Sequence, residues 1–529
     1  MENTATKYIF VTGGVASGLG KGIVAASLGR LLKSRGYRIS NQKFDPYINV
    51  DPSFMSPIQH GEVFVTDDGA ECDLDVGHYE RFTDESLTVN SNITAGKIYL
   101  SVLEKERAGD YDGKTVQVIP HITNHIKDLV MKVAKDGTRD IVITEIGGTV
   151  GDMESRPFLE AFRQMIFDVG RENVLYVHVT LLPYLEKGGE IKTKPTQHSV
   201  KELLSMGIQP DMLVCRTSHP LTEEIKNKIA LFCNVSRDCV IENMDADSVY
   251  EVPLLLEDQN LAQVALKRLS LQDHPANLTE WRALVDKQKA ITESVKISLV
   301  GKYTVLADAY FSTAEALKAA GFANNVNICI NWVAAESLEK GDMTPLHGSH
   351  GILIGGGFGV RGTQGKIAAA KYAREAKIPC FAMGMGAQAM AIDFARNIMG
   401  LSDANSTEFD ETTPHPIAHN IYDKMRLGAS PCDITEGTLA HKIYGNTETH
   451  ERHRHRYEFN TEYREDFEEQ GFIFSGASPD GKLLEICELS RDIHPWFLGV
   501  TFNPQFKSRP NVPHPIFAAF VEQAKGMRK

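Results

Sequence analysis

The sequence predicts an α/β protein of two domains, each built on a parallel sheet. Apolar segments of strand length alternate with helical segments along most of the chain, a pattern typical of parallel sheets covered by helices on both faces. At 529 residues the chain exceeds the length at which a single core usually stops growing. A polar stretch at residues 272–294 separates two such runs. We therefore expect domains at residues 1–271 and 295–529, joined by a linker.

The expected elements follow in chain order. In the first domain we expect strands at residues 8–11, 116–119, 141–144, 174–179 and 212–215 and helices at 23–34, 121–134, 157–169 and 199–206. In the second we expect strands at 295–300, 326–332, 351–354 and 378–381 and helices at 314–320 and 388–398. The strand segments are short, continuous apolar runs, as in strands buried on both faces. The linker is expected to contain a short helix at residues 278–289.

The composition is that of a globular protein, with 42% hydrophobic and 24% charged residues. The net charge of −13 argues against binding nucleic acid or anionic membranes, because both require a basic face. No apolar run reaches the roughly 18 residues that a membrane span needs, and the N-terminus does not resemble a signal peptide. We expect a cytoplasmic protein without nucleic-acid or membrane partners, whose eight scattered cysteines are reduced.

A glycine-rich turn, TGGVASGLGKG at residues 12–22, follows the first strand and begins the first helix. The backbone N–H groups of such a turn can surround phosphate oxygens, and Lys21 can neutralise a transferred phosphoryl group. The turn departs from the usual phosphate-loop pattern, because Gly22 stands where a serine or threonine would ligate magnesium. A turn that only permits close packing is the alternative.

If the loop cannot hold the metal, carboxylates elsewhere must do so. The acidic run at residues 67–75 offers several, and Glu145 follows a buried strand at the end where α/β sheets bind ligands. For the acidic run, a solvated surface is the alternative. A second cluster, residues 192–197 with Lys228, offers lysines and hydroxyls that suit a triphosphate, and an exposed basic loop is its alternative.

Five longer segments resemble the CTP synthase family. They are KFDPYINVDP at 43–52, MSPIQHGEVFV at 55–65, GHYERF at 77–82, EIGGTVGD at 145–152 and KTKPTQ at 192–197. The resemblance extends over essentially the whole chain. It implies a P-loop-type amidoligase domain followed by a domain like the class I glutamine amidotransferases. It further implies that ATP phosphorylates the 4-oxygen of UTP and that ammonia then displaces phosphate from C4 to give CTP.

The resemblance assigns roles position by position. ATP would be bound by Ser17, Gly18, Leu19, Gly20, Lys21, Gly22, Lys43 and Arg216, and Mg²⁺ by Asp75 and Glu145. UTP or CTP would be bound by Gln117, Asp152, Glu154, Lys192, Thr193, Lys194, Gln197 and Lys228, and ammonia would enter past His60 and Val63. Lys21 and Lys43 would be catalytic, because they stabilise charge on the transferring phosphoryl group. A homotetramer is also implied.

The second domain departs from the family at the three positions that hydrolyse glutamine. The family's turn Gly-x-Cys-x-Gly reads AMGMG here, with Gly384 at the nucleophile position. The family's Phe-His-Pro-Glu-Phe reads FNPQF, which places Asn503 and Gln505 where the base and its orienting acid belong. Neither amide can shuttle a proton at neutral pH. Cys380 is the alternative nucleophile, but it belongs to a strand and lacks a base.

We therefore expect an ATP-dependent ligase that makes CTP from UTP with ammonia, and not with glutamine hydrolysed by this chain. The ammonia would come from solution or from a separate protein. One alternative is a ligase that aminates a modified pyrimidine nucleotide or uses another amine. A second is a non-catalytic nucleotide-binding regulatory subunit of a CTP synthase. The intact ATP and metal positions weigh against the second, since a pseudoenzyme need not keep them.

Overall fold

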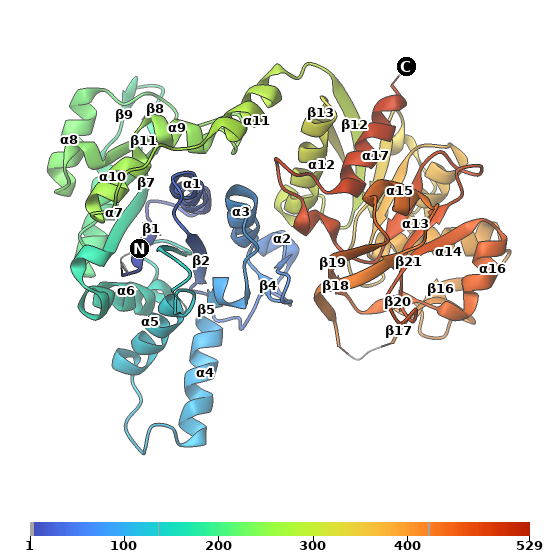
Figure 1. Ribbon diagram of the computed structural model, residues 1–529, viewed down its shortest axis with the longest axis horizontal. Coiled ribbons are helices and arrows are strands. Elements are labelled where there is room, and N and C mark those ends of the chain that lie inside the picture. Colours follow the sequence, from blue (N-terminus) through green and yellow to red (C-terminus); the bar gives the residue numbers. More distant parts are fainter. Residues whose placement is uncertain (1–4, 136, 422–423, 529) are drawn as a thin grey trace. The chain divides into compact units, whose positions relative to one another are not determined.

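The computed structural model of the protein describes residues 5–135, 137–421 and 424–528 (Figure 1). The chain packs as two compact units. Unit 1 comprises Met1–Phe54 and Cys72–Val285, and unit 2 comprises Met55–Glu71 and Asp286–Lys529. The prediction placed residues 55–71 in the first domain, which was expected to span residues 1–271. In the structure this segment packs with the C-terminal unit.

Unit 1 is built on a seven-stranded sheet of order β11-β10-β7-β1-β6-β2-β5, and its neighbouring strands run parallel. The strands are β1 (Lys7–Gly13), β2 (Ile39–Asp45), β5 (Asn92–Thr94), β6 (Ile141–Ile146), β7 (Val174–Leu181), β10 (Met212–Thr217) and β11 (Val240–Met244), with a separate hairpin of β8 (Tyr184–Leu185) and β9 (Glu190–Ile191). β1 lies between β6 and β7, so the strand order reverses beside it. Open α/β sheets bind ligands at the carboxyl ends of the strands at such a point.

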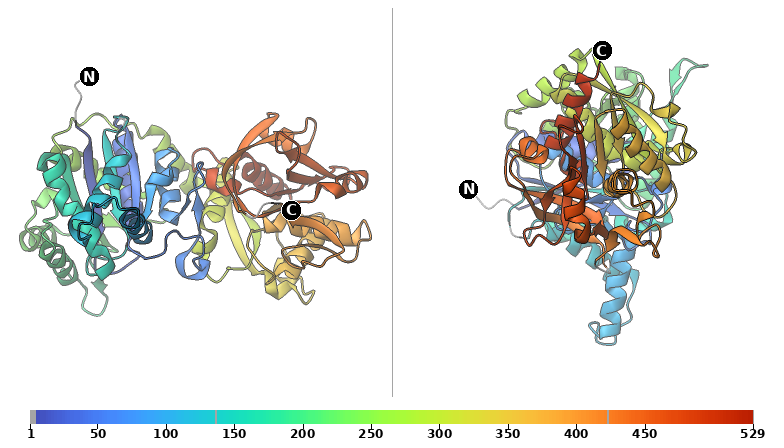
Figure 2. Two further views of the ribbon diagram at one scale, coloured as in Figure 1. Left: turned by 90° about the horizontal axis from the view of Figure 1, so that it is seen from below. Right: turned by 90° about the vertical axis from the view of Figure 1, so that its right-hand side faces the viewer.

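Helices cover both faces of this sheet (Figure 2). They are α1 (Lys21–Lys33), α3 (Leu74–Thr83), α4 (Ala95–Ala108), α5 (Thr123–Lys132), α6 (Arg156–Val169), α7 (Lys194–Ser205), α8 (Glu223–Cys233), α9 (Val252–Asp258) and α10 (Leu261–Arg268), followed by α11 (Thr279–Ala290). α5 and α6 share one hydrophobic core with the sheet, in which the rings of Phe10 and Phe162 stack with centroids 4.2 Å apart. α1 packs against α3 and α9.

The prediction of a strand at residues 116–119 is wrong. The segment joins α4 to α5 and ends in a single π-helical turn, Val118–Ile122. The side chains of Val118 and Ile119 are exposed, so the apolar run has no second layer to pack against. In Figure 1 this connection lies at the far end of the projecting α4–α5 hairpin of unit 1.

Unit 2 contains a nine-stranded sheet of order β13-β12-β14-β15-β23-β22-β21-β18-β19. These strands are β12 (Ser294–Gly301), β13 (Asn327–Ala334), β14 (Gly351–Ile354), β15 (Cys380–Met383), β18 (Arg426–Ile434), β19 (Glu448–His455), β21 (Phe472–Ala477), β22 (Leu484–Leu489) and β23 (Phe497–Val500). The first five strands of this order, from β13 to β23, pair in parallel with their neighbours. The remaining pairings are antiparallel. The carboxyl ends of β15 and β23 therefore lie side by side.

Unit 2 also contains helices and a small second sheet. The helices are α2 (Pro57–His60), α12 (Phe311–Ala323), α13 (Thr363–Glu375), α14 (Met385–Asn397), α15 (Leu439–Tyr444), α16 (Arg464–Glu469) and α17 (Pro515–Gly526), and β16 (Ala404–Ser406), β17 (His415–Asn420) and β20 (Tyr457–Phe459) form a small sheet. Two hydrophobic cores, one containing α13 and α14 and the other α12 and α17, pack against the large sheet. Among the described residues no helix is long and apolar enough to cross a membrane. The eight cysteines are free, and Cys329 is the exposed one.

Candidate active site

The glycine-rich turn connects β1 to α1 at the centre of the sheet in unit 1. Gly20, with φ of 86°, ends the turn and precedes Lys21, the first residue of α1. The side chain of Lys21 folds back along the turn, and its Nζ donates to the carbonyl oxygen of Gly148 at 2.7 Å. A β-carbon at Gly13 would lie 2.5 Å from Cδ of Lys21, so this close packing requires glycine. Burial lowers the pKa of Lys21.

Lys43, on the neighbouring strand β2, lies among carboxylates. Its ammonium contacts Oδ2 of Asp75 and lies 3.2 Å from Oε1 of Glu145. Asp45 and Asp73 are 3.9 Å and 4.0 Å from the same nitrogen. Burial alone would lower the pKa of Lys43, but these carboxylates outweigh it and hold the pKa well above its usual value. Lys43 is therefore charged, and it neutralises part of a buried acidic cluster.

Asp75 accounts for the unusual glycine at position 22. A β-carbon at Gly22 would lie 2.1 Å from Oδ1 of Asp75, so the carboxylate fills the space that a serine or threonine would need. Asp75 sits in the first turn of α3, whose N-cap residue Asp73 accepts a hydrogen bond from the backbone N–H of Asp75 at 2.9 Å. Asp75 thus places a carboxylate oxygen from another helix beside the loop position where a serine or threonine hydroxyl would lie.

The two carboxylates predicted to bind Mg²⁺ converge on one cation, the ammonium of Lys43. Within the described part of the chain no group of three or more acidic, histidine or cysteine side chains could hold a metal. Two carboxylates nevertheless fit Mg²⁺, which usually completes its coordination with phosphate oxygens and water. Asp75 and Glu145 therefore have the chemistry of the predicted metal ligands.

Sequence reasoning gave no role to two residues that shape this cluster. The hydroxyl of Tyr79 donates to Oε2 of Glu145, and burial raises the pKa of that carboxyl group. Asp45, which accepts from Nδ2 of Asn92 at 2.8 Å, has its pKa raised to about 7 by burial and by Asp73. Both Tyr79 and Asp45 lie within the segments that resemble the CTP synthase family, and this was the sequence feature that could have identified them.

The turn also meets the loop after β6 and the start of α7. A cavity of about 350 Å³ is lined by Gly14, Val15, Thr149, Val150, Gly151, Pro195, His198, Ser199 and Glu202. Asp152 closes the loop after β6, because its carboxylate accepts from the N–H and hydroxyl groups of Thr149 at 2.6 and 2.8 Å. Gln197 donates to the Thr193 hydroxyl at 3.1 Å. Three predicted binding segments, far apart in sequence, therefore meet at one cavity.

Buried His178 links these segments from below, a role that sequence reasoning missed. Its Nδ1 lies 2.8 Å from the hydroxyl of Thr12 and its Nε2 lies 2.8 Å from the hydroxyl of Ser199. Burial, with the charge of Lys21 nearby, lowers the pKa of His178 to about 3. The imidazole is neutral at physiological pH and connects β1, β7 and α7. No sequence signal distinguished it from an ordinary core histidine.

The remaining predicted ligands of unit 1 differ in their contacts and in their exposure. Arg216 donates to the carbonyl oxygen of Gly18 at 3.5 Å and pairs with Asp245 at 2.9 Å, which places it beside the glycine-rich turn. Lys192 pairs with Glu190, whose pKa is lowered by Lys192 and by Lys228. The predicted ligands Ser17, Glu154, Lys194 and Lys228 are exposed, whereas Leu19 and Thr193 are buried.

Gln117 lies between α4 and α5, directly before the π-helical turn Val118–Ile122. Its backbone N–H donates to Nδ1 of His121 at 3.0 Å. Gln117 is exposed, and the residues that line the cavity beside the phosphate loop do not include it.

The acidic run at residues 67–75 is divided between the units. Asp67 pairs with Arg452 at 2.6 Å and Glu71 with Arg454 at 2.8 Å, all within unit 2. Asp73 and Asp75 belong to unit 1. His60 and Val63, predicted at the ammonia entrance, likewise belong to unit 2, where the neighbouring Glu62 accepts from the backbone N–H of Ser312 at 2.8 Å.

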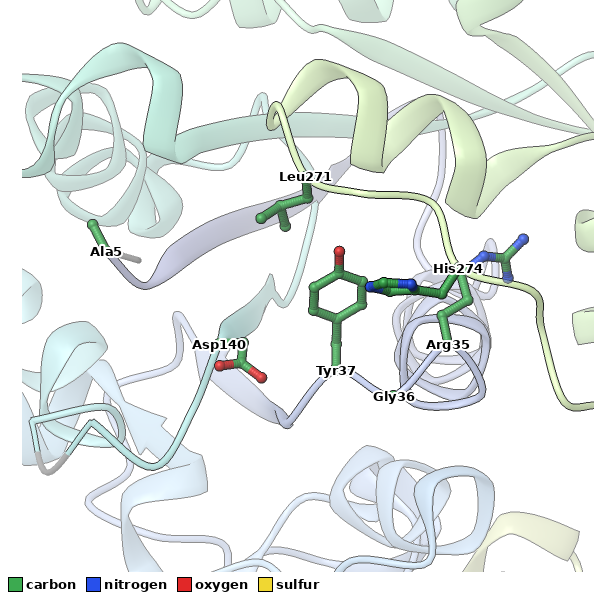
Figure 3. A pocket seen from close by; sticks show the side chains of 7 residues that line it. All are labelled: Ala5, Arg35, Gly36, Tyr37, Asp140, Leu271 and His274. Atoms are coloured by element: carbon green, nitrogen blue, oxygen red, sulfur yellow. The ribbon is translucent and has the colours of Figure 1, made fainter. Parts of the chain in front are cut away.

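A further cavity, of about 400 Å³, lies at the opposite end of the unit 1 sheet (Figure 3). Tyr37 and Asp140 directly precede β2 and β6, so this cavity opens at the amino ends of the strands. Its polar groups are occupied within the protein: Tyr37 donates to the carbonyl oxygen of Gln272 at 2.5 Å, and Asp140 pairs with Arg38 at 2.6 Å. We assign it no part in the site.

Unit 2 retains the backbone of a nucleophile turn without a nucleophile. Gly384 joins β15 to α14 with φ of 55° and ψ of −118°, and its N–H donates to the carbonyl oxygen of Val500 at 2.8 Å. A β-carbon there would meet nothing nearer than Cα of Gly356 at 3.8 Å and the carbonyl oxygen of Thr501 at 3.9 Å. The position therefore has room for a side chain, although the positive φ strains any residue other than glycine.

The two other altered positions follow the neighbouring strand β23. Asn503 precedes the single turn Pro504–Lys507, which contains Gln505. The side-chain oxygens of both residues are buried and have no hydrogen-bond partner. Cys380 is fully buried within β15, and burial raises the pKa of its thiol well above the usual value. A cysteine held in this way is a poor nucleophile.

Two buried lysines hold the loop that faces Gly384. Lys366 donates to the carbonyl oxygens of Gly355 and Gly356 at 2.6 and 2.7 Å, and Lys302 donates to that of Phe358 at 2.8 Å. Burial lowers the pKa of Lys302 to about 8 and that of Lys366 well below its usual value. Both lysines therefore hydrogen-bond to this loop, although Gly384 at the nucleophile position has no side chain.

Comparison with known proteins agrees with both halves of this description. The family model described as CTP synthase N-terminus matches residues 7–271, and that described as glutamine amidotransferase class-I matches residues 305–523. The CTP synthase of Moorella thermoacetica is 57% identical over 98% of each chain, and that of Ruminiclostridium cellulolyticum is 58% identical over 98% of this chain and 99% of its own. The solved glutaminase domain of Trypanosoma brucei CTPS with bound acivicin is 35% identical, with a TM-score of 0.42, over 45% of this chain and 96% of that domain.

The family assignment rests on the full-length relatives and on the first family model, which agree with the parallel-sheet unit and its phosphate loop. The chain belongs to the CTP synthase family, ATP-dependent carbon–nitrogen ligases that convert UTP into CTP.

Proposed function

We propose that this chain forms CTP from UTP, ATP and free ammonia, and that it does not hydrolyse glutamine. The observation that carries the second part is the set of residues around the unit 2 turn. Gly384 offers no thiol for an acyl intermediate, and Asn503 and Gln505 offer neither a base nor its acidic partner. Cys380, buried in its strand, does not replace them.

The reaction begins with transfer of the γ-phosphoryl group of ATP to the 4-oxygen of UTP, which releases ADP. Lys21 and Lys43 stabilise the charge that develops on the transferring group, the largest contribution in reactions of this kind. Asp75 and Glu145 would hold Mg²⁺, which would supply further positive charge to the phosphate oxygens. Ammonia then attacks C4, the bond from C4 to the phosphorylated oxygen breaks, and inorganic phosphate leaves with that oxygen.

The nucleotides occupy the carboxyl edge of the unit 1 sheet. We assign the ATP phosphates to the glycine-rich turn with Lys21, and place Arg216 near the rest of the nucleotide. We assign the pyrimidine nucleotide to the loop containing Asp152 and Glu154 and to the segment Lys192–Gln197, with Lys228 and Gln117 as further ligands. The cavity shared by the turn, the loop and α7 supports this arrangement. A homotetramer is the proposed assembly.

Glutamine is the alternative nitrogen source. The match of residues 305–523 to the class I glutamine amidotransferase family favours it, since such domains supply ammonia from glutamine in relatives. The two candidates are separated by assaying the purified chain with ATP, Mg²⁺ and UTP, together with either ammonium or glutamine. CTP formed with ammonium and not with glutamine supports the proposal, and CTP formed with glutamine as readily as with ammonium contradicts it.

A further inference from the structure

Four buried oxygens without hydrogen-bond partners lie on the chain segments around Gly384. They are Oγ1 of Thr501, Oδ1 of Asn503, Oε1 of Gln505 and Oε1 of Gln388. Three of these residues follow β23, and Gln388 is in the first turn of α14. Buried polar atoms in proteins are nearly always paired, so such a group calls for a ligand or water.

The topology brings these segments together. β15 and β23 are parallel neighbours in the register Met383 to Val500, so the residues that follow them emerge at the same edge of the sheet. Gln388 lies one helical turn after Gly384 and its backbone N–H donates to the carbonyl oxygen of Gly384 at 3.3 Å. Because Gly384 has no side chain, the space that a cysteine would fill is open on this edge.

Burial makes the absence of partners costly. The side chains of Thr501, Gln388 and Gln505 are 2%, 4% and 6% exposed. Bulk solvent therefore does not satisfy their oxygens, and a polar group that is buried without a partner destabilises the folded state. A ligand that donates several hydrogen bonds would recover this loss.

The chemistry of the group selects among ligands. The amide oxygens of Asn503, Gln505 and Gln388 only accept hydrogen bonds, and ammonia offers three N–H donors and one lone pair. The ammonium group of Lys302, which holds the adjacent loop, disfavours a second cation. Glu408 is the nearby acid, and it already accepts from the N–H of Gly359 at 2.8 Å. Neutral ammonia therefore fits better than ammonium.

We infer that the former glutaminase site has become a binding site for neutral ammonia, held by the oxygens of Thr501, Gln505 and Gln388. This inference rests on the proposed function and names the place where the nitrogen substrate is first bound. The replacement of a titratable base by amides serves the same end. Protonation would remove the nucleophilic lone pair of ammonia, and amides do not protonate ammonia.

The test measures the KM for ammonia, with ammonium chloride as the probe at fixed pH and saturating ATP and UTP. Thr501→Val, Gln505→Leu and Gln388→Leu should each raise this KM by about five- to tenfold, the effect of one ordinary hydrogen bond. The kcat at saturating ammonia and the KM values for ATP and UTP should not change. Thr501→Ser, which keeps the hydroxyl, should retain the wild-type KM.

Thr413→Val is the matched control. Its hydroxyl is also buried in unit 2 but donates to the carbonyl oxygen of Asp403 at 2.8 Å. This variant should lose thermal stability and keep the wild-type KM for ammonia, whereas Thr501→Val should lose no stability. Wild-type activity with ammonia combined with an unchanged KM in all three site variants would overturn the inference alone. Absence of ammonia-dependent activity in the wild-type chain would overturn the proposed function as well.

Discussion

The carboxylate of Asp75 occupies the space beside Gly22, where a β-carbon would lie 2.1 Å from its Oδ1 atom. The glycine of the loop and the carboxylate are thus fitted to each other, because a side chain at position 22 would need the space that Asp75 fills.

This relationship predicts strong coupling between the two positions. Gly22→Ala should destabilise unit 1 by about 1–3 kcal/mol, because the added methyl group overpacks the contact with Asp75. In an Asp75→Ala background the same change should cost less than about 0.5 kcal/mol. Thermal denaturation of the nucleotide-free proteins, arranged as a double-mutant cycle, measures the difference. If Gly22→Ala destabilised the wild-type protein and the Asp75→Ala variant equally, a side chain at position 22 would not clash with Asp75.

Lys21→Ala should reduce the rate of CTP formation by about 10²- to 10³-fold, because a buried positive charge aimed at the transferring phosphoryl group is lost. Lys33→Ala is the control at the other end of α1, where the lysine pairs with Glu85 at 2.6 Å on a partly exposed surface. It should leave the rate unchanged. Steady-state assays at saturating ATP and UTP decide the matter, and undiminished turnover in Lys21→Ala would refute the phosphate-loop assignment.

Asp45 predicts a pH-dependent stability. Its pKa is raised to about 7 by burial and by Asp73, above the ordinary value of 3.8. The folded protein therefore binds more protons than the unfolded chain between about pH 4 and 7, and Asp45 makes the fold less stable as pH rises through this window. Asp45→Asn should gain at least about 1 kcal/mol relative to wild type between pH 5 and pH 8. Thermal denaturation of both proteins across this range tests the sign, and a gain that shrinks toward pH 8 would contradict it.

The retained backbone around Gly384 predicts that glutamine hydrolysis can be restored. Gly384→Cys alone should release no glutamate, because Asn503 cannot act as a base. Gly384→Cys combined with Asn503→His and Gln505→Glu should release glutamate measurably, since the turn has room for the side chain and the lysines still hold the facing loop. Glutamate is measured with and without UTP and ATP. Activity in the single variant equal to that in the triple variant would contradict the role given to Asn503.

The sequence predicted the order of most strands and helices because their apolar runs are buried on both faces, as in β6 and β14. It missed β2 for the opposite reason. This strand is fully buried, yet five of its seven residues, Ser40 to Lys43 and Asp45, are polar. Their partners, such as Thr144, which donates to Oε1 of Gln42 at 3.0 Å, come from distant segments. Local pattern cannot reveal such pairing.

The candidate site was predictable as a set of residues and not as an arrangement. The acidic run at residues 67–75 reads as one cluster, but helix α3 directs Asp75 to Lys43 while Asp67 pairs with Arg452. His178 carried no signal, because its partners Thr12 and Ser199 are brought to it only by the sheet. The departures of unit 2 from the family pattern, at Gly384, Asn503 and Gln505, are visible in the sequence because they depend on residue type alone.

The most direct test of the account is an isotope competition. The purified chain is incubated with ATP, Mg²⁺, UTP, nitrogen-15 ammonium and an excess of unlabelled glutamine, and the CTP is analysed by mass spectrometry. We predict that all CTP formed carries nitrogen-15 and that glutamate does not rise above a control without protein. Unlabelled CTP that appears together with an equal amount of glutamate would contradict the proposal that this chain uses ammonia and does not hydrolyse glutamine.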